Sequence, residues 1–230
     1  MRLISYNLRK HRAAGELAGL VDRYGIDVLC LQECDTTDIP ESIAGLCLAD
    51  STQRNRLGLA VYYRANTYRP VGIRSLALKK SLHDMVLKPA EERLLGVRLH
   101  DIDSGRDVVV GSFHAAPLTA LNSLRRHQIR TALAELEALG QGLPTLMVGD
   151  YNYPVFKENL GQKVREQGYE LSLSDSRTYT RYRFFRGHYD FATSVGFDIE
   201  RVRTLPQGLS DHLPILVTAR VSSDAAVGVA

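Results

Sequence analysis

The sequence has no tryptophan and only three cysteines among its 230 residues. The cysteines, Cys30, Cys34 and Cys47, are odd in number, so they cannot all pair within the chain. No group of four cysteines and histidines has the spacing of a zinc site. We therefore expect free thiols in a reducing compartment, which excludes a disulfide framework and a zinc-stabilised fold.

The chain also lacks any apolar run close to the roughly 20 residues that a membrane-spanning helix needs. Its first residues, Met1 to Asn7, do not resemble a signal peptide, because charged and polar residues interrupt them at once. These two absences lead us to expect a cytoplasmic protein that does not associate with a membrane.

Three signatures of common enzyme classes are missing as well. There is no Gly-x-Ser-x-Gly nucleophile elbow, no phosphate-binding loop ending in Gly-Lys-Ser/Thr, and no Gly-x-Gly-x-x-Gly dinucleotide fingerprint. The sequence thus lacks the usual marks of nucleotide-driven transfer and of dinucleotide redox chemistry.

What is there is an ordinary globular composition, with 44% hydrophobic and 24% charged residues and a formal net charge of +3. This small positive excess permits a polyanionic partner without requiring one. We find no repeat, low-complexity linker or shift in composition. We therefore predict a single domain over residues 1–220, followed by a flexible tail at 221–230.

Hydrophobic periodicity predicts a mixture of β-hairpins and βα units. The continuous apolar run at 27–32 is typical of a strand buried on both faces, and Arg125, Arg126 and Arg130 are expected on the outer face of the longest helix. This mixture predicts an α/β (α+β) fold in which helices flank a strand-rich middle. The predicted strands are 3–8, 27–32, 59–63, 71–78, 93–100, 106–113, 145–148, 189–194, 199–204 and 213–220, and the predicted helices are 16–24, 118–139 and 156–167.

Several of the apolar runs end in a residue that binds metal or moves protons, namely Asn7, Glu33, His114 and Asp150. In α/β sheets, ligand sites form in crevices outside strand ends, so such residues can meet from distant sequence positions. The carboxylate of Glu33 is costly at the end of an apolar strand unless it is paired or binds a cation. Each residue alone also has a structural interpretation: Asn7 bonded to its own backbone, Glu33 as a surface residue, His114 as a structural histidine.

Asp150 and Asn152 follow a buried strand and are two residues apart. If this segment is extended, both side chains point the same way, and a carboxylate beside an amide can hold a water or an oxyanion. The alternative is a turn, because Gly149, Asp150, Asn152 and Pro154 are all turn formers. We favour the extended arrangement.

Asp190 lies among aromatic residues, and His212 at the start of the last predicted strand is the obvious partner. A carboxylate in this position fixes the tautomer of an imidazole and raises its basicity. Taken alone, His212 is more often a structural histidine. Together, the carboxylates, amides and histidines at the strand ends favour Mg²⁺ and metal-assisted hydrolysis of a phosphoester.

Six short motifs carry a family resemblance, and they occur in the family's order. With them the chain resembles the endonuclease/exonuclease/phosphatase superfamily, which includes deoxyribonuclease I, over essentially its whole length. The resemblance implies a deoxyribonuclease I-like four-layer sandwich, in which two packed mixed β-sheets are flanked by helices. The motifs are Ile4-Ser5-Tyr6-Asn7, Leu31-Gln32-Glu33, Ser112-Phe113-His114-Ala115-Ala116-Pro117, Gly149-Asp150-Tyr151-Asn152, Tyr189-Asp190-Phe191 and Ser210-Asp211-His212-Leu213-Pro214-Ile215.

The resemblance further implies hydrolysis of a P–O bond with Mg²⁺, for which Mn²⁺ can substitute. Glu33 would bind the metal ion, and Asn7 and Asp211 would lie beside the metal or the phosphate.

The same resemblance implies roles in the proton transfers. Asp150 would position the attacking water, and Asn152 would bond the phosphoryl oxygens. His212, oriented by Asp190, would act as general base or as phosphate ligand, and His114 would lie near the leaving group. Whether Asp150 or the His212–Asp190 pair takes the proton stays open.

The substrate is less well indicated. Arg181, Tyr182 and Arg183 interleave charge and aromatic rings, which suits single-stranded nucleic acid, although a loop or strand with one solvated basic face explains them slightly better. His114 replaces the tyrosine of the family's abasic-site endonucleases, and His188 stands where the family usually has arginine. We favour a nuclease-like phosphodiesterase. The alternatives are a hydrolase of a small or lipid-derived phosphoester of the inositol phosphate type, and a non-catalytic binding module.

Overall fold

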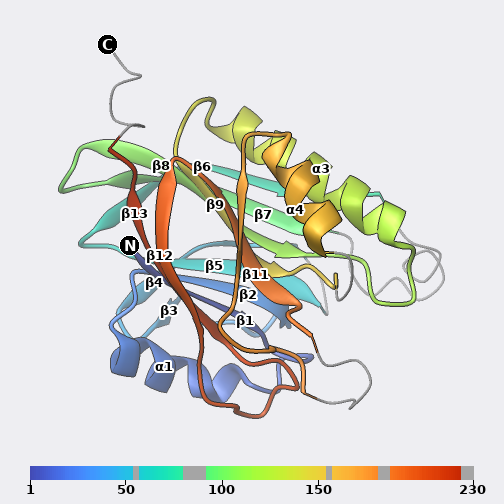
Figure 1. Cartoon of the computed structure of the whole chain (residues 1–230). Coiled ribbons are helices and arrows are strands. Elements are labelled where there is room, and N and C mark those ends of the chain that lie inside the picture. Colours follow the sequence, from blue (N-terminus) through green and yellow to red (C-terminus); the bar gives the residue numbers. More distant parts are fainter. Residues whose placement is uncertain (54–56, 80–91, 154–156, 181–186, 224–230) are drawn as a thin grey trace.

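The computed structural model of the chain describes residues 1–53, 57–79, 92–153, 157–180 and 187–223. Over these residues it forms two β-sheets packed face to face, with helices on both outer faces (Figure 1). The predicted four-layer sandwich of two mixed sheets flanked by helices is therefore confirmed. No helix in the described ranges is long and apolar enough to cross a membrane.

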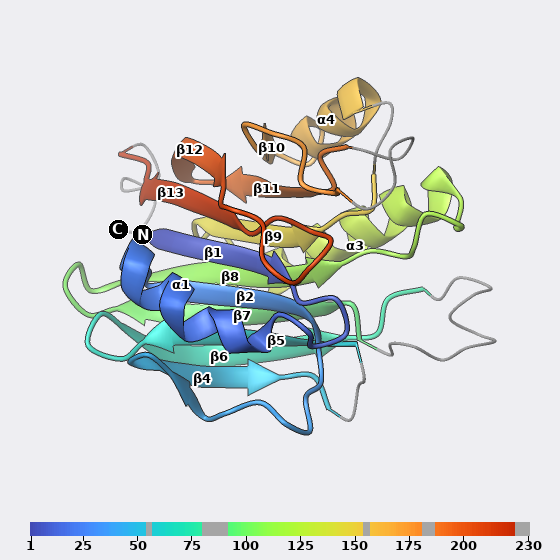
Figure 2. The same ribbon diagram turned by 90° about the horizontal axis from the view of Figure 1, so that it is seen from below.

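The first sheet contains both ends of the described chain. Its strand β1 is parallel to β2 on one side and antiparallel to β13 on the other. The last strand before the tail therefore lies beside the first, as Figure 2 shows. The strand order is β12 (Phe197–Thr204), β13 (Ile215–Val221), β1 (Arg2–Asn7), β2 (Val28–Cys34), β5 (Gly58–Arg64), β4 (Leu46–Ser51) and β3 (Ser42–Ile43).

The second sheet places three strand ends side by side. Strand β9 is parallel to β8 and antiparallel to β11, so Asp150 lies opposite His114 on one side and opposite Asp190 on the other. The strand order is β10 (Glu170–Leu173), β11 (Asp190–Val195), β9 (Thr145–Asp150), β8 (Arg106–His114), β7 (Leu94–Asp101) and β6 (Tyr68–Leu76).

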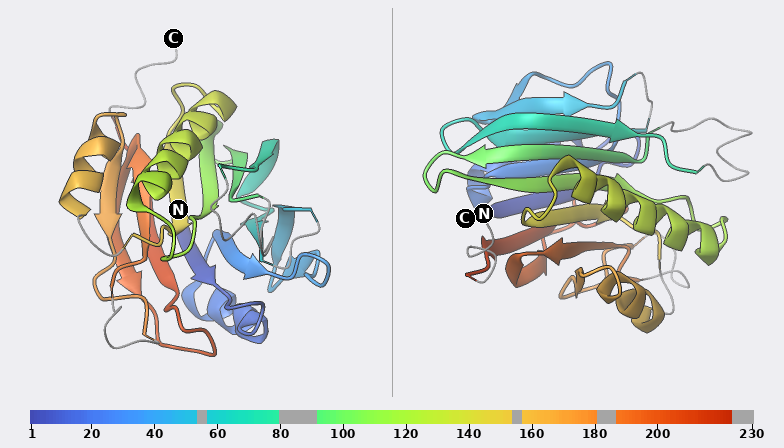
Figure 3. Two further views of the ribbon diagram at one scale, coloured as in Figure 1. Left: turned by 90° about the vertical axis from the view of Figure 1, so that its right-hand side faces the viewer. Right: turned by 90° about the horizontal axis from the view of Figure 1, so that it is seen from above.

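Alternation along the strands builds three apolar layers. Within β1, Leu3 packs between the two sheets, whereas Ile4 packs on the opposite face toward α1 (Leu17–Tyr24). A short 3₁₀ helix (Ala14–Glu16) precedes α1. The other outer layer lies under α3 (Asn122–Leu139) and α4 (Lys157–Arg165), which are seen from above in Figure 3. Because β2 contributes to two of these layers, it is buried on both faces, as predicted.

Three sequence-based predictions about these elements are wrong. Strands β3, β4 and β10 were not predicted, because short or half-polar edge strands carry little apolar alternation. Helix α3 begins at Asn122 rather than at 118, because Leu121 has an extended backbone. Arg125 is buried instead of outward-facing, and its guanidinium donates hydrogen bonds to the Pro117 carbonyl oxygen and the Asn122 side chain.

Candidate active site

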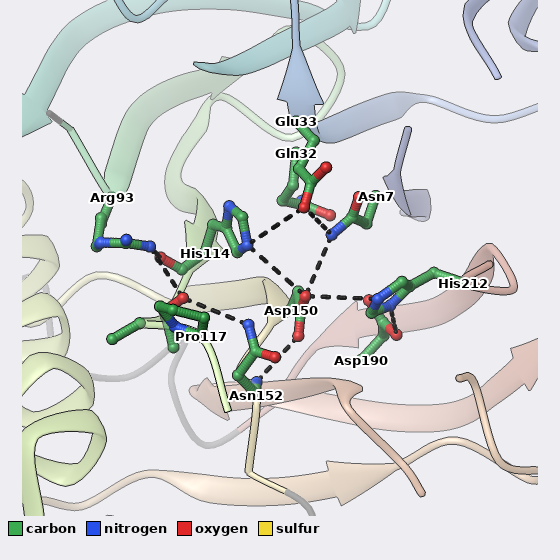
Figure 4. Close-up of polar contacts among 12 residues, drawn as sticks. Asn7, Gln32, Glu33, Arg93, His114, Pro117, Asp150, Asn152, Asp190 and His212 are labelled. Atoms are coloured by element: carbon green, nitrogen blue, oxygen red, sulfur yellow. Dashed lines mark hydrogen bonds and ion pairs between the residues drawn. The ribbon is translucent and has the colours of Figure 1, made fainter. Parts of the chain in front are cut away.

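The strand ends of the two sheets meet at one end of the sandwich and line a cleft of about 520 Å³. We call it the central cleft. Figure 4 shows that side chains from β1, β2, β8, β9 and β11 point toward one another there. The predicted site residues that line it are Glu33, His114, Asp150, Asn152, Asp211 and His212, and the buried Asn7 and Asp190 lie directly behind them.

Asn7 joins the two sheets at the end of β1. Its Nδ2 donates to Asp150 Oδ2 at 3.1 Å and approaches Glu33 Oε1 at 3.5 Å, while its Oδ1 accepts a hydrogen bond from the backbone N–H of Arg9. With these three contacts the buried amide holds one carboxylate from each sheet at the same place.

Glu33 reaches the cleft because the backbone of β2 is distorted. The register with β5 shifts between Leu31 and Cys34, and Glu33 has a φ of +53°, which re-aims its side chain. The loop after β1 then faces it, since Lys10, itself at a φ of +56°, donates its backbone N–H to Glu33 Oε2 at 2.9 Å. Strained backbone on both sides of a carboxylate is a feature of functional sites.

Asp150 and Asn152 both line the cleft, but the predicted extended arrangement is wrong. Asn152 has a φ of +47°, and its backbone N–H donates to Asp150 Oδ1 at 2.9 Å, so the segment forms the turn that was the alternative. Asparagine tolerates this left-handed conformation better than most residues. The preceding Gly149, at a φ of +149°, lies so close to β8 that a Cβ would sit 1.8 Å from the Phe113 carbonyl oxygen.

His212 and Asp190 form the predicted pair. Nδ1 of His212 lies 2.8 Å from Asp190 Oδ2, so Nδ1 carries the proton and Nε2 faces the cleft, 3.7 Å from Asp150 Oδ2. Ser210 fixes the loop, because its hydroxyl donates to the Asn7 carbonyl oxygen and accepts the His212 backbone N–H. The imidazole thus has a fixed position relative to β1.

His114 lies on the opposite wall of the cleft from His212. Its Nε2 is 3.7 Å from Asp150 Oδ2 and 3.9 Å from Glu33 Oε1. The buried guanidinium of Arg93 donates to the backbone carbonyl oxygens of His114 and Ala115, which holds the end of β8 in place.

Asp211 and the predicted substrate residues stand apart from this cluster. Asp211 lines the cleft farther out and pairs with Arg9 at 3.5 Å. Arg181, Tyr182 and Arg183 lie outside the residues that the structure describes.

Sequence reasoning did not assign roles to Gln32, Ser112, Arg9 and Arg93. Gln32 is fully buried between the sheets, and its amide donates to the hydroxyls of Ser112 and Ser5. This polar bridge lies beneath Asn7 and Glu33 and ties β1, β2 and β8 together. A buried glutamine beside Glu33 in an apolar strand was the available signal, because such an amide needs partners.

The protonation equilibria of the cleft are strongly perturbed. Burial raises the pKa of Asp150 to about 7, and the nearby Asp190 carboxylate adds to the rise, although His212 opposes it. Burial lowers the pKa of His212, but the charges of Asp190 and Asp150 outweigh it and raise the value to about 10. The neighbouring carboxylates therefore favour the imidazolium form of His212, whereas burial favours the protonated form of Asp150.

The donor set fits a divalent cation. Glu33 and Asp150 approach the same Asn7 Nδ2 and the same His114 Nε2, so their carboxylates share one small space. Asp150, Asp190 and His212 also offer ligand atoms within 4.8 Å of one another, but His212 and Asp190 already bond to each other. A Mg²⁺-like ion binds hard carboxylate oxygens. Its positive charge stabilises the ionised form of a buried carboxyl group whose pKa is raised, such as that of Asp150.

Comparison with known proteins agrees with this architecture. Many solved structures superpose on the chain, and three of them illustrate the similarity. An endonuclease/exonuclease/phosphatase from Bacteroides vulgatus gives a TM-score of 0.76 at 12% identity, over 96% of this chain and 98% of the other. D. rerio TDP2, complexed with single strand DNA product, gives 0.74 at 15% identity, over 96% and 99%. A mannosyl-6-phosphatase from Bacteroides thetaiotaomicron gives 0.73 at 18% identity, over 96% and 99%.

No curated protein matches the chain. A sequence model described as the endonuclease/exonuclease/phosphatase family, however, matches residues 4–212, which includes every predicted site residue from Asn7 to His212. The chain therefore belongs to the endonuclease/exonuclease/phosphatase family.

Proposed function

We propose that this protein is a divalent-metal-dependent phosphoester hydrolase of the nuclease-like phosphodiesterase type, formed by one catalytic domain over residues 1–220. The observation that carries the proposal is the meeting of Glu33 and Asp150 with the His212–Asp190 pair in one cleft, although these residues lie on four separate strands or loops. The three free cysteines support a reducing, cytoplasmic location.

Glu33 would hold the metal ion, Mg²⁺ with Mn²⁺ as a substitute, with Asn7 behind it and Asp211 farther out along the cleft. The bound ion supplies positive charge that offsets the negative charge developing on the phosphoryl oxygens. The backbone N–H of Lys10 on Glu33 Oε2 orients the carboxylate, so its other oxygen faces the space it shares with Asp150.

The two perturbed groups have complementary tasks in the proposal. Asp150, with a pKa of about 7, accepts the proton of the attacking water. His212, held as an imidazolium by Asp190, donates from Nε2 to a phosphoryl oxygen. The Asn152 amide also lines the cleft and would make a second donation to the phosphoryl oxygens, and His114 would lie near the leaving group.

The basic rim supports a polyanionic substrate. Arg9, Lys10 and Arg12 line the central cleft, which favours nucleic acid over a neutral-tailed phosphoester. The fold itself is compatible with a nucleic acid and with a small phosphoester. The similar structure of TDP2 was solved with single strand DNA product, and another similar structure is a mannosyl-6-phosphatase. A monoester substrate is therefore the alternative that the assay has to separate.

The test is hydrolysis of bis(4-nitrophenyl) phosphate and of 4-nitrophenyl phosphate with Mg²⁺, with Mn²⁺ and with a chelator. We expect metal-dependent cleavage of the diester, and a loss of at least about a hundredfold in kcat for His212→Ala, the scale for one transition-state donor. His127→Ala, an exposed histidine on α3, is the matched control and should retain activity. Turnover that survives the chelator would overturn the metal-dependent mechanism, and preference for the monoester would favour the alternative.

A further inference from the structure

A second groove, of about 800 Å³, opens beside the central cleft. The two cavities share part of their wall, so they lie side by side. Arg9, Tyr179 and Asp211 line both, and Arg177, His188 and Gln207 line the groove alone.

The shared wall is fixed to the reacting centre. Tyr179 forms an isolated β-bridge with His212, and the two rings meet edge to face with centroids 5.0 Å apart. The next residue, Thr180, donates its backbone N–H and its hydroxyl to the Asp211 carbonyl oxygen. The groove therefore keeps a constant position relative to the phosphate that His212 would contact.

The acidic groups of the groove are already neutralised. Asp175 accepts two hydrogen bonds from Thr204 and pairs with Arg201 at 3.5 Å, and Asp211 pairs with Arg9 at 3.5 Å. Arg177 is exposed, and within the described residues it makes no ion pair. The positive charge of Arg177 is thus available to an anion, and the guanidinium fork suits a phosphate.

The size of the groove also indicates an extended substrate. A cleft of about 520 Å³ is within the roughly 300–1,000 Å³ that typically accommodates a complete small ligand, so a small phosphoester would leave the groove unused. An oligonucleotide would occupy both cavities, with a neighbouring phosphate near Arg177 and with Tyr179 offering an aromatic surface to a base.

We infer that this groove binds a second phosphate of a single-stranded oligonucleotide, adjacent to the phosphate that reacts in the central cleft. The inference rests on the proposed function and adds the substrate class to it. It predicts that a trinucleotide, which has two phosphodiesters, is cleaved more efficiently than a dinucleotide, which has one.

The experiment compares kcat/KM for bis(4-nitrophenyl) phosphate, a thymidine dinucleotide and a thymidine trinucleotide, with Mg²⁺ or Mn²⁺. The trinucleotide should exceed the dinucleotide by about tenfold, the scale of one well-placed arginine–phosphate contact. Arg177→Ala should remove most of that advantage, whereas Arg106→Ala, an exposed arginine at the other end of β8, should retain it.

The outcomes separate the two proposals. Two results would overturn the inference and leave the proposed function standing, provided that the reporter diester is cleaved. One is equal kcat/KM for the dinucleotide and the trinucleotide. The other is an advantage of the trinucleotide that persists in Arg177→Ala. Absence of metal-dependent cleavage of bis(4-nitrophenyl) phosphate and of both oligonucleotides would overturn both proposals.

Discussion

The hydrogen bond between His212 and Asp190 sets the charge of the imidazole, and the variant Asp190→Asn tests this directly. Asparagine preserves the size of the side chain and an acceptor oxygen for Nδ1, 2.8 Å away in the native protein, but removes the negative charge. The perturbation is therefore electrostatic rather than steric.

The magnitude follows from Coulomb's law. Opposite charges about 4 Å apart at an effective dielectric constant of about 20 attract by about 4 kcal/mol. Each pH unit corresponds to about 1.4 kcal/mol, so losing this attraction lowers the pKa of His212 by about 3. The pKa of about 10 in the native protein would fall to about 7 in the variant.

The sign of the effect on activity depends on the task of His212. If the imidazolium donates to the phosphoryl oxygens, the variant should be nearly as active as the native protein near pH 6. At pH 8.5 it should be roughly thirtyfold less active than the native protein at the same pH, because only a few per cent of an imidazole with a pKa of about 7 stays protonated. The native protein, with a pKa of about 10, should show no such fall between these values.

The assay has two parts, an imidazole titration by NMR in metal-free protein and a pH profile of kcat/KM with metal. Asp198→Asn, an exposed aspartate that bonds Ser222 and Arg220, is the matched control. A His212 pKa that stays near its native value in Asp190→Asn would refute the electrostatic reasoning. An activity of the variant, relative to the native protein at the same pH, that stays constant or rises with pH would refute the assignment of His212 as a cation.

Three further predictions follow from the same contacts. Mg²⁺ or Mn²⁺ should raise the Tm of the native protein but that of Glu33→Gln much less, as measured by differential scanning fluorimetry; equal increases would place the ion elsewhere. Gly149→Ala should destabilise by about 3 kcal/mol or more in urea unfolding, because its Cβ would overlap a carbonyl oxygen of β8, whereas Gly105→Ala meets open space and should cost about 1 kcal/mol. With a thiol reagent, only the half-buried Cys47 should react in the native protein, whereas all three cysteines should react after unfolding. Fast reaction of all three thiols in the native protein would contradict the burial of Cys30 and Cys34.

The composition of the site could be read from the sequence because strand ends are local features. An apolar run stops where a polar residue begins, so Asn7, Glu33, His114 and Asp150 stood out without knowledge of the topology. Which strand ends meet was not contained in those local patterns. It depends on β9 lying between β8 and β11, which sets Asp150 opposite both His114 and Asp190.

Other features escaped prediction for physical reasons. Asn152 leaves the extended conformation because a hydrogen bond to its neighbour Asp150 stabilises a left-handed turn, and spacing alone does not distinguish the two. Arg125 is buried because backbone carbonyl oxygens accept its guanidinium, and those carbonyls are positioned only by the folded loop before α3. The polar bridge of Gln32 likewise exists only once the two sheets have packed.

The most direct test of the central claim is the position of a bound Mn²⁺ ion in a crystal of this protein, located by anomalous scattering. The account predicts an anomalous peak in the central cleft, in contact with the Glu33 carboxylate and facing Asp150. Mn²⁺ bound at another surface while hydrolysis proceeds, or a cleft that stays empty at saturating Mn²⁺, would contradict it.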